Sequence, residues 1–135
     1  MLISWNDHFA LGIDVVDTGH GLVIEAINQL NEATTPADSA AVAGRMLPLL
    51  LRTLPQQFAA ESALLAGLPA ELRATHEGEH HRFLDTLDFL HRAHLGGNDA
   101  SGPLLLNLVC FLVSHLRATD LDSYAARRRH HAVAA

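Results

Sequence analysis

Residues 69–97 read PAELRATHEGEHHRFLDTLDFLHRAHLGG, and this stretch carries the start and stop signals of one long helix. Pro69 suits the beginning of a helix, and the pair Gly96-Gly97 suits its end. His76 and His80 lie four residues apart, so on a helix they share one face and can bind one ion together. Alone, such a pair is more often two surface or satisfied histidines than a metal site. The stretch therefore predicts a helix and offers two candidate ligands.

Helical periodicity continues on both sides of this stretch, after an irregular arm that we expect over residues 1–18. Thr35 and Pro36 provide a hydroxyl cap and a proline at the first helical position, and Asp38 adds an acid to the first turn. Short connections between long helices favour antiparallel neighbours, so we predict an all-α protein. Its architecture would be an up-down-up-down four-helix bundle, a single domain over residues 1–135. The expected helices cover residues 20–33, 35–65, 69–94 and 101–120.

Two prolines interrupt the second expected helix. Pro48 and Pro55 lie in its interior, where proline removes a backbone hydrogen bond and bends the chain. Because Pro55 lies just before Gln57 and Glu61, we expect a bent backbone where those side chains project. Whether Gln56 or Gln57 faces inward stays open on the sequence alone.

Composition narrows the classes of function. Apolar residues make up 49% of the chain and charged residues 18%, which argues against disorder, and the net charge of −6 argues against nucleic acid as a partner. The basic run 127–131 is expected to be a solvated tail, and Cys110, the only cysteine, a small core residue. The most apolar window, residues 104–113, is far too short to span a membrane, and no signal peptide is recognisable at the start. These features predict a cytoplasmic protein without membrane insertion.

Further candidate ligands lie on every expected helix. Gln57 and Glu61 repeat the four-residue spacing, and His115 and Asp120 are five apart, which an ideal helix separates by about 140°. That last pair can reach one centre only if the helix widens or ends there, as single wide turns do at functional sites. Imidazoles and carboxylates together suit iron, manganese or zinc. The complete candidate set is His20, Gln57, Glu61, His76, His80, His115 and Asp120, with no catalytic residue besides.

From Trp5 to about Tyr124 the chain resembles the bacterial hemerythrins. The start, Trp5, Gly12-Ile13, Asp17 and His20, resembles the opening motif of that family. Residues 57–61, QFAAE, resemble its H-F-x-x-E segment with glutamine in place of histidine, and His76-x-x-x-His80 and His115-x-x-x-x-Asp120 match its third and fourth helices.

The resemblance implies two non-haem irons, joined by an oxo or hydroxo group, that bind dioxygen reversibly. Carried over by position, one iron would be held by His76, His80 and His115. The other, with the open coordination position, would be held by His20 and residue 57, and Glu61 and Asp120 would bridge the two. Phe58, Phe83, Leu112 and Leu116 are expected to form an apolar surrounding, or simply to be core.

Gln57 is the departure from the family pattern, and it falls on the iron where dioxygen should bind. An amide oxygen is a harder and generally weaker donor to ferrous iron than an imidazole nitrogen. Gln57 can coordinate through its oxygen, yield its place to water, or leave the second metal weakly bound or absent. We expect a protein that carries, stores or delivers dioxygen rather than an enzyme. The alternatives are a redox enzyme acting on peroxide or nitric oxide, and a metal-binding bundle that no longer handles dioxygen.

Overall fold

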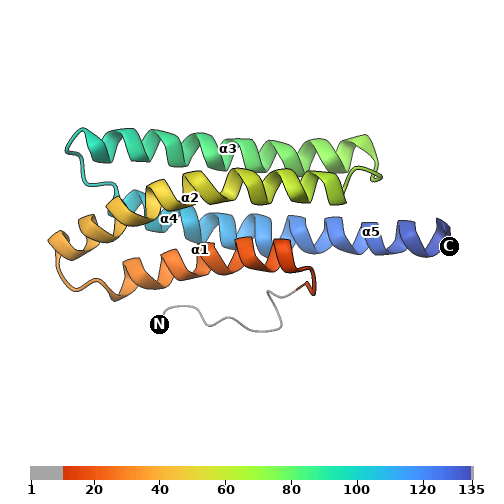
Figure 1. Ribbon diagram of the computed structural model, residues 1–135, viewed down its shortest axis with the longest axis horizontal. Coiled ribbons are helices and arrows are strands. Elements are labelled where there is room, and N and C mark those ends of the chain that lie inside the picture. Colours follow the sequence, from red (N-terminus) through yellow and green to blue (C-terminus); the bar gives the residue numbers. More distant parts are fainter. Residues whose placement is uncertain (1–10, 135) are drawn as a thin grey trace.

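The computed structural model describes the backbone of residues 11–134, with the side chains of that range except those at 117, 118, 121 and 130–134. Every regular element in this part of the chain is a helix (Figure 1). The α4 and α5 helices and the π-helix η1 between them follow one another without interruption. The elements are α1 (Asp14–Glu32), α2 (Pro36–Leu64), α3 (Ala70–Leu95), α4 (Ser101–Phe111), η1 (Leu112–Thr119) and α5 (Asp120–Ala134).

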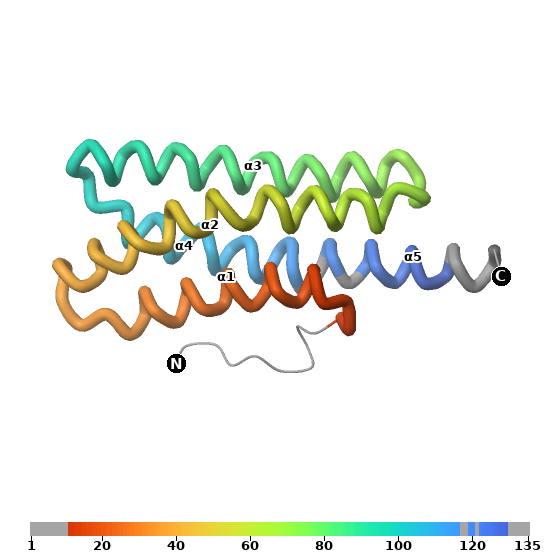
Figure 2. Tube along the Cα trace, viewed as in Figure 1, coloured from red at the N-terminus to blue at the C-terminus, as the bar shows by residue number. Residues whose placement is uncertain are grey.

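The helices form a bundle around a shared apolar core. α1 packs against α2 and α4, and α3 packs against the same two helices, as the trace in Figure 2 shows. Leucines dominate the core: Leu47, Leu50, Leu54, Leu87, Leu104 and Leu108 are fully buried. A smaller apolar cluster of Val16, Leu65, Leu68 and Tyr124 lies apart from this core. No helix in the described part of the chain is both long and apolar enough to cross a membrane.

The boundaries of α2 and α3 agree with the sequence signals. The Thr35 hydroxyl oxygen accepts a hydrogen bond of 3.0 Å from the backbone N–H of Asp38, as a helix cap should. α2 remains helical through Pro48 and Pro55, and Pro55 is exposed, where water can satisfy the carbonyl that the proline leaves free.

The first helix begins earlier than expected, at Asp14 rather than near His20. Gly12 adopts a positive φ of 74°, and the Asp17 carboxylate accepts hydrogen bonds from the backbone N–H groups of Leu11 and Gly12. These contacts order the turn before the helix, so the expectation of an irregular arm reaching residue 18 was wrong. His20 consequently lies inside α1. The expected arm over residues 1–10 lies outside the described part of the chain.

The continuous helical segment that begins with α4 extends beyond its expected end near Asp120, through α5 to Ala134. The basic run therefore begins inside a helix, and Arg127 is half-buried there, with its Nε donating a hydrogen bond of 3.2 Å to the carbonyl oxygen of Leu64. Leu64 lies in the last turn of α2, and the carbonyl groups of a last turn have no hydrogen-bond partner within their own helix. The expectation of a solvated tail was wrong for Arg127, while Arg128 and Arg129 are exposed.

Cys110 is exposed, so its expected place in the core was wrong. The apolar run around it covers every face of α4, and only one face can meet the bundle. Leu104, Leu108 and Phe111 are buried, whereas Leu106 and Val113 are 65% and 58% exposed. In such a run the hydrophobic pattern does not say which side turns inward.

Candidate metal centre

The structure buries six of the seven candidate ligands in one place, and they come from α1, α2, α3, η1 and the start of α5. Their ligand atoms form two groups, each lying within 4.8 Å: His76, His80, His115 and Asp120 in one, and His20, Glu61 and Asp120 in the other. Asp120 belongs to both. Ionisable side chains are seldom buried so completely unless they are paired or hold a metal. The exposed fractions are His20 4%, Glu61 3%, His76 1%, His80 4%, His115 1% and Asp120 1%.

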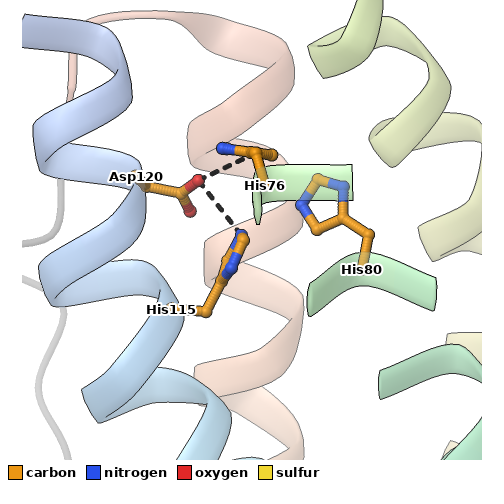
Figure 3. Close-up of side chains that lie close together, drawn as sticks. All are labelled: His76, His80, His115 and Asp120. Atoms are coloured by element: carbon orange, nitrogen blue, oxygen red, sulfur yellow. Dashed lines mark ion pairs between the residues drawn. The ribbon is translucent and has the colours of Figure 1, made fainter. Parts of the chain in front are cut away.

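The Asp120 carboxylate stands between the two groups. Its Oδ1 lies 3.2 Å from Nε2 of His76 and 3.1 Å from Nε2 of His115, and His80 lies beside them (Figure 3). Its Oδ2 lies 2.8 Å from Nε2 of His20. One carboxylate oxygen thus faces each group, which is the arrangement a bridging ligand needs.

The wide turn expected between His115 and Asp120 is present. Residues 112–119 form a π-helix, and the backbone N–H of Asp120 bonds to the carbonyl oxygen of His115 five residues earlier. A π turn brings residues five apart onto one side of the helix, whereas an α-helix would separate them. The local backbone is therefore what directs both side chains to the same centre.

Glu61 supplies the second carboxylate. Its Oε2 lies 3.6 Å from Nε2 of His80 and its Oε1 3.9 Å from Nε2 of His76, while the Tyr124 hydroxyl donates to Oε1 at 3.3 Å. Burial, and then the nearby Asp120 charge, raise the pKa of Glu61 to about 9, with the Tyr124 hydrogen bond opposing the shift. Without a metal, Glu61 carries a proton at neutral pH, and a bound cation would replace it.

Asp120 behaves in the opposite way. Burial by itself would raise its pKa, but contacts with His115 and His20 hold the pKa well below its usual range. The same two carboxylates that could bridge a metal pair are therefore held in different protonation states. Two buried anions side by side would repel strongly, and protonation of one removes that cost.

The histidines are suited to bind a cation through their free lone pairs. Burial lowers the pKa of His76, and burial together with the neighbouring His115 and His76 lowers that of His80 to about 2, so both rings are neutral at physiological pH. The Nε2 atoms of His76, His80 and His115 and Oδ1 of Asp120 are buried without a hydrogen-bond partner among the described residues. Unsatisfied buried donors and acceptors are costly. Because these three nitrogens and the Asp120 oxygen converge on one point, a metal ion bound there would satisfy them.

Gln57, not Gln56, faces the interior. Gln56 is exposed, whereas Oε1 of Gln57 is buried and has no hydrogen-bond partner among the described residues. The side chain lies one turn before Glu61 and packs beside Gly19, the residue before His20. A methyl group added at Gly19 would lie 3.6 Å from Cβ of Gln57 and 3.9 Å from its Oε1. Gln57 therefore extends toward the helix that carries His20.

Phenylalanine rings cover two of the three histidines, His80 and His115. Phe58 stacks on His80 with ring centroids 3.7 Å apart, and Phe111 stacks on His115 at 4.6 Å and on Phe83 at 3.8 Å. Of the expected apolar residues, Phe58, Phe83, Leu112 and Leu116 are all buried. Phe111 was missed, although it precedes His115 by four residues and so shares its helical face.

Sequence reasoning also missed the partners of the second ring nitrogens. Nδ1 of His76 lies 3.1 Å from the Ser123 hydroxyl, and Nδ1 of His115 lies 3.4 Å from Oε2 of Glu79. Ligand histidines usually give their second N–H to such an acceptor, so a search for polar residues one turn from each ligand was the available signal. His81 is exposed, as expected for a residue outside the ligand set, and Nδ1 of His94 accepts from the backbone N–H of Ala100.

A helical bundle whose interior holds histidines and two carboxylates in two overlapping groups defines a metal-binding bundle protein. The chain is 30% identical over 130 residues to a bacteriohemerythrin of Stenotrophomonas maltophilia, and the alignment covers 96% of this chain and 84% of that protein. It is 29% identical over 128 residues to a bacteriohemerythrin of Pseudomonas aeruginosa, covering 95% and 82%. The chain belongs to the bacteriohemerythrin family. No protein-family model matches it, and no solved structure matches it significantly.

Proposed function

We propose that this chain is a non-haem di-iron protein that binds dioxygen for carriage, storage or delivery. The observation that carries the proposal is the set of buried, unpartnered Nε2 atoms of His76, His80 and His115 around Oδ1 of Asp120. Imidazole and carboxylate donors of this kind suit iron. The proposal includes the up-down-up-down helix order predicted from the short connections.

In the proposed assignment, His76, His80 and His115 would hold one iron, His20 and Gln57 would hold the other, and Glu61 and Asp120 would be shared between them. The ions, when bound, supply the reversible electron transfer on which dioxygen binding depends. The remaining work falls to the protein. Asp120 keeps the two subsites together, Tyr124 orients Glu61, and the rings of Phe58 and Phe111 keep water from His80 and His115.

The two subsites differ in their donors. The first has three imidazole nitrogens, whereas the second has one, together with carboxylate oxygens and the Gln57 amide oxygen. Because amide oxygen is the weaker ligand for ferrous iron, we expect the second subsite to bind its metal less tightly. The unpartnered, buried Oε1 of Gln57 supports coordination through oxygen over displacement by water.

The same feature favours a second candidate function. With a weaker ligand at the open iron, the pair would react more readily with peroxide or nitric oxide, as a redox enzyme does. Turnover of peroxide with a reducing dye separates the candidates, because a carrier should show little of it.

The test of the proposal is metal content together with the visible spectrum of the aerobic protein, before and after reduction and re-exposure to air. A dioxygen-binding protein should contain about two irons per chain and develop a new visible band on re-exposure. Two irons with immediate return of the oxidised spectrum would favour the redox enzyme. One metal or none would contradict the di-iron proposal.

A further inference from the structure

The second nitrogen of His115 faces a carboxylate that the ligand pattern does not include. Nδ1 of His115 lies 3.4 Å from Oε2 of Glu79, and neither atom has another hydrogen-bond partner among the described residues. His115 is 1% exposed and the Glu79 side chain 20%. The contact is therefore largely shielded from water. In such a shielded environment a charge acts more strongly on its neighbour than it does in water.

Glu79, on α3, is itself held in place by a residue of η1. Its Oε1 accepts a hydrogen bond of 2.9 Å from the hydroxyl of Thr119, the last residue of η1. Glu79 lies on α3 directly before His80, whereas Thr119 lies directly before Asp120. The contact chain from Thr119 through Glu79 to His115 thus ties α3 to the π-helix at the level of the ligands. No lysine or arginine among the described side chains forms an ion pair with Glu79.

The corresponding ring nitrogen of His76 has a neutral partner. Nδ1 of His76 lies 3.1 Å from the hydroxyl of Ser123. A carboxylate makes the opposite nitrogen of an imidazole a stronger donor to a metal than a hydroxyl does, and it fixes the tautomer and the ring orientation. Of His76 and His115, His115 is therefore the one whose second ring nitrogen faces a charged group.

We propose that Glu79, anchored by Thr119, is a positioning residue that orients His115 and strengthens its Nε2 as a metal ligand. This inference rests on the proposed metal centre. Through His115, the negative charge of Glu79 favours the more oxidised state of the metal in the three-histidine subsite. The 3.4 Å separation is longer than a good hydrogen bond, and a metal on Nε2 would make Nδ1–H a better donor to Oε2 of Glu79.

The test compares Glu79→Gln with Glu77→Gln. Glu77 is exposed, lies on the same helix two residues away, and loses the same charge in its variant. The readouts are the affinity of the metal-free protein for Co²⁺, measured against a chelator, and the midpoint potential of the iron-loaded protein. For Glu79→Gln we expect Co²⁺ affinity to fall roughly 10–100-fold, as loss of such partners typically causes. We also expect the midpoint potential to rise by about 59 mV per tenfold change in the ferric-to-ferrous affinity ratio. Glu77→Gln should change both by much less, because Glu77 is exposed and contacts no ring nitrogen of a candidate ligand.

Thr119 offers a second pair of variants that leaves the carboxylate intact. Thr119→Val removes the anchoring hydroxyl and should shift affinity and potential in the same direction by less, whereas Thr119→Ser should restore the parent values. Equal behaviour of Glu79→Gln and Glu77→Gln would overturn the inference, and if Glu79→Gln fails to fold, equality of Thr119→Val and Thr119→Ser would do so. Failure of the parent protein to bind two metals would instead overturn the proposed function.

Discussion

His20 and Asp120 are one hundred positions apart in the chain, yet Nε2 of His20 lies 2.8 Å from Oδ2 of Asp120. The contact joins α1 to the start of α5, and the other oxygen of the same carboxylate faces His76 and His115. Asp120 therefore belongs to both groups of closely spaced ligand atoms, and in the proposed assignment it shares the bridging role with Glu61.

Removing His20 should empty only the second subsite. We expect His20→Ala to retain about one tightly bound iron per chain, because the three-histidine group and Asp120 remain. Asp120→Asn should weaken both subsites, since it removes the shared anion. Anaerobic titration with ferrous iron, followed by metal analysis, distinguishes the two. Loss of both metals from His20→Ala would contradict unequal, separable subsites.

Replacing Gln57 by histidine should lengthen the life of the dioxygen adduct. An imidazole at this position completes the nitrogen donors of the second subsite and leaves less room for water. We expect roughly a tenfold longer lifetime by stopped-flow spectroscopy, within the range that changes around a metal ligand produce. The control is Gln56→His, which places the same group on the exposed neighbour. Equal lifetimes for the parent and Gln57→His would show that the ligand at position 57 does not limit the lifetime of the adduct.

The metal-free protein should be most stable near pH 6.5. The pKa of Glu61 is raised from 4.5 to about 9, so its contribution is full below pH 4.5 and is lost as pH rises through 9. The pKa values of His76 and His80 are lowered from 6.5, that of His80 to about 2, so their contributions are full above 6.5 and are lost as pH falls. Above pH 6.5 only the loss from Glu61 remains, at roughly 1 kcal/mol per pH unit.

Urea unfolding of the metal-free protein at pH 6.5 and 8.5 tests this. We expect the lower free energy of unfolding at pH 8.5, and Glu61→Gln should abolish most of the difference because glutamine does not titrate. A parent protein equally stable at both values would show that Glu61 is not held protonated. The same proton makes iron affinity rise with pH over this range, since binding must displace it.

Phe58 should protect the centre as well as the fold. A cavity of about 480 Å³ between α2 and α3 is lined by Phe58, His80, Leu84 and their neighbours, and the Phe58 ring covers one face of His80. Phe58→Ala would uncover the face of His80 that the ring now shields and admit water from this space to the metal centre. We expect faster autoxidation and a loss of about 3 kcal/mol in stability, as for other buried phenylalanines.

The matched control is Phe58→Leu, which keeps an apolar side chain over His80. Autoxidation should then stay near the parent rate while stability falls by less. If Phe58→Ala oxidises no faster than Phe58→Leu, the ring serves packing alone.

Local signals accounted for much of the fold. Thr35 and Pro36 began α2, Pro69 preceded α3, and Gly96 ended it, because caps, proline and glycine act within a few residues. They were insufficient where stability comes from contacts distant in sequence. The start of α1 depends on the turn held by Asp17 and Gly12, and the continuation of α5 is accompanied by the bond from Arg127 to Leu64.

By itself, the sequence indicated which side chains could form a metal site and that the helix had to widen or end between His115 and Asp120, because ligand spacing along a helix is simple geometry. Tertiary structure alone decided that Gln57 rather than Gln56 faces inward, that Cys110 is exposed, and that Glu79 stands against His115. The physical reason is packing. The rotation of each helix about its axis is set by the neighbours it buries, and partners such as Glu79 and His115 meet only once two rods are in contact.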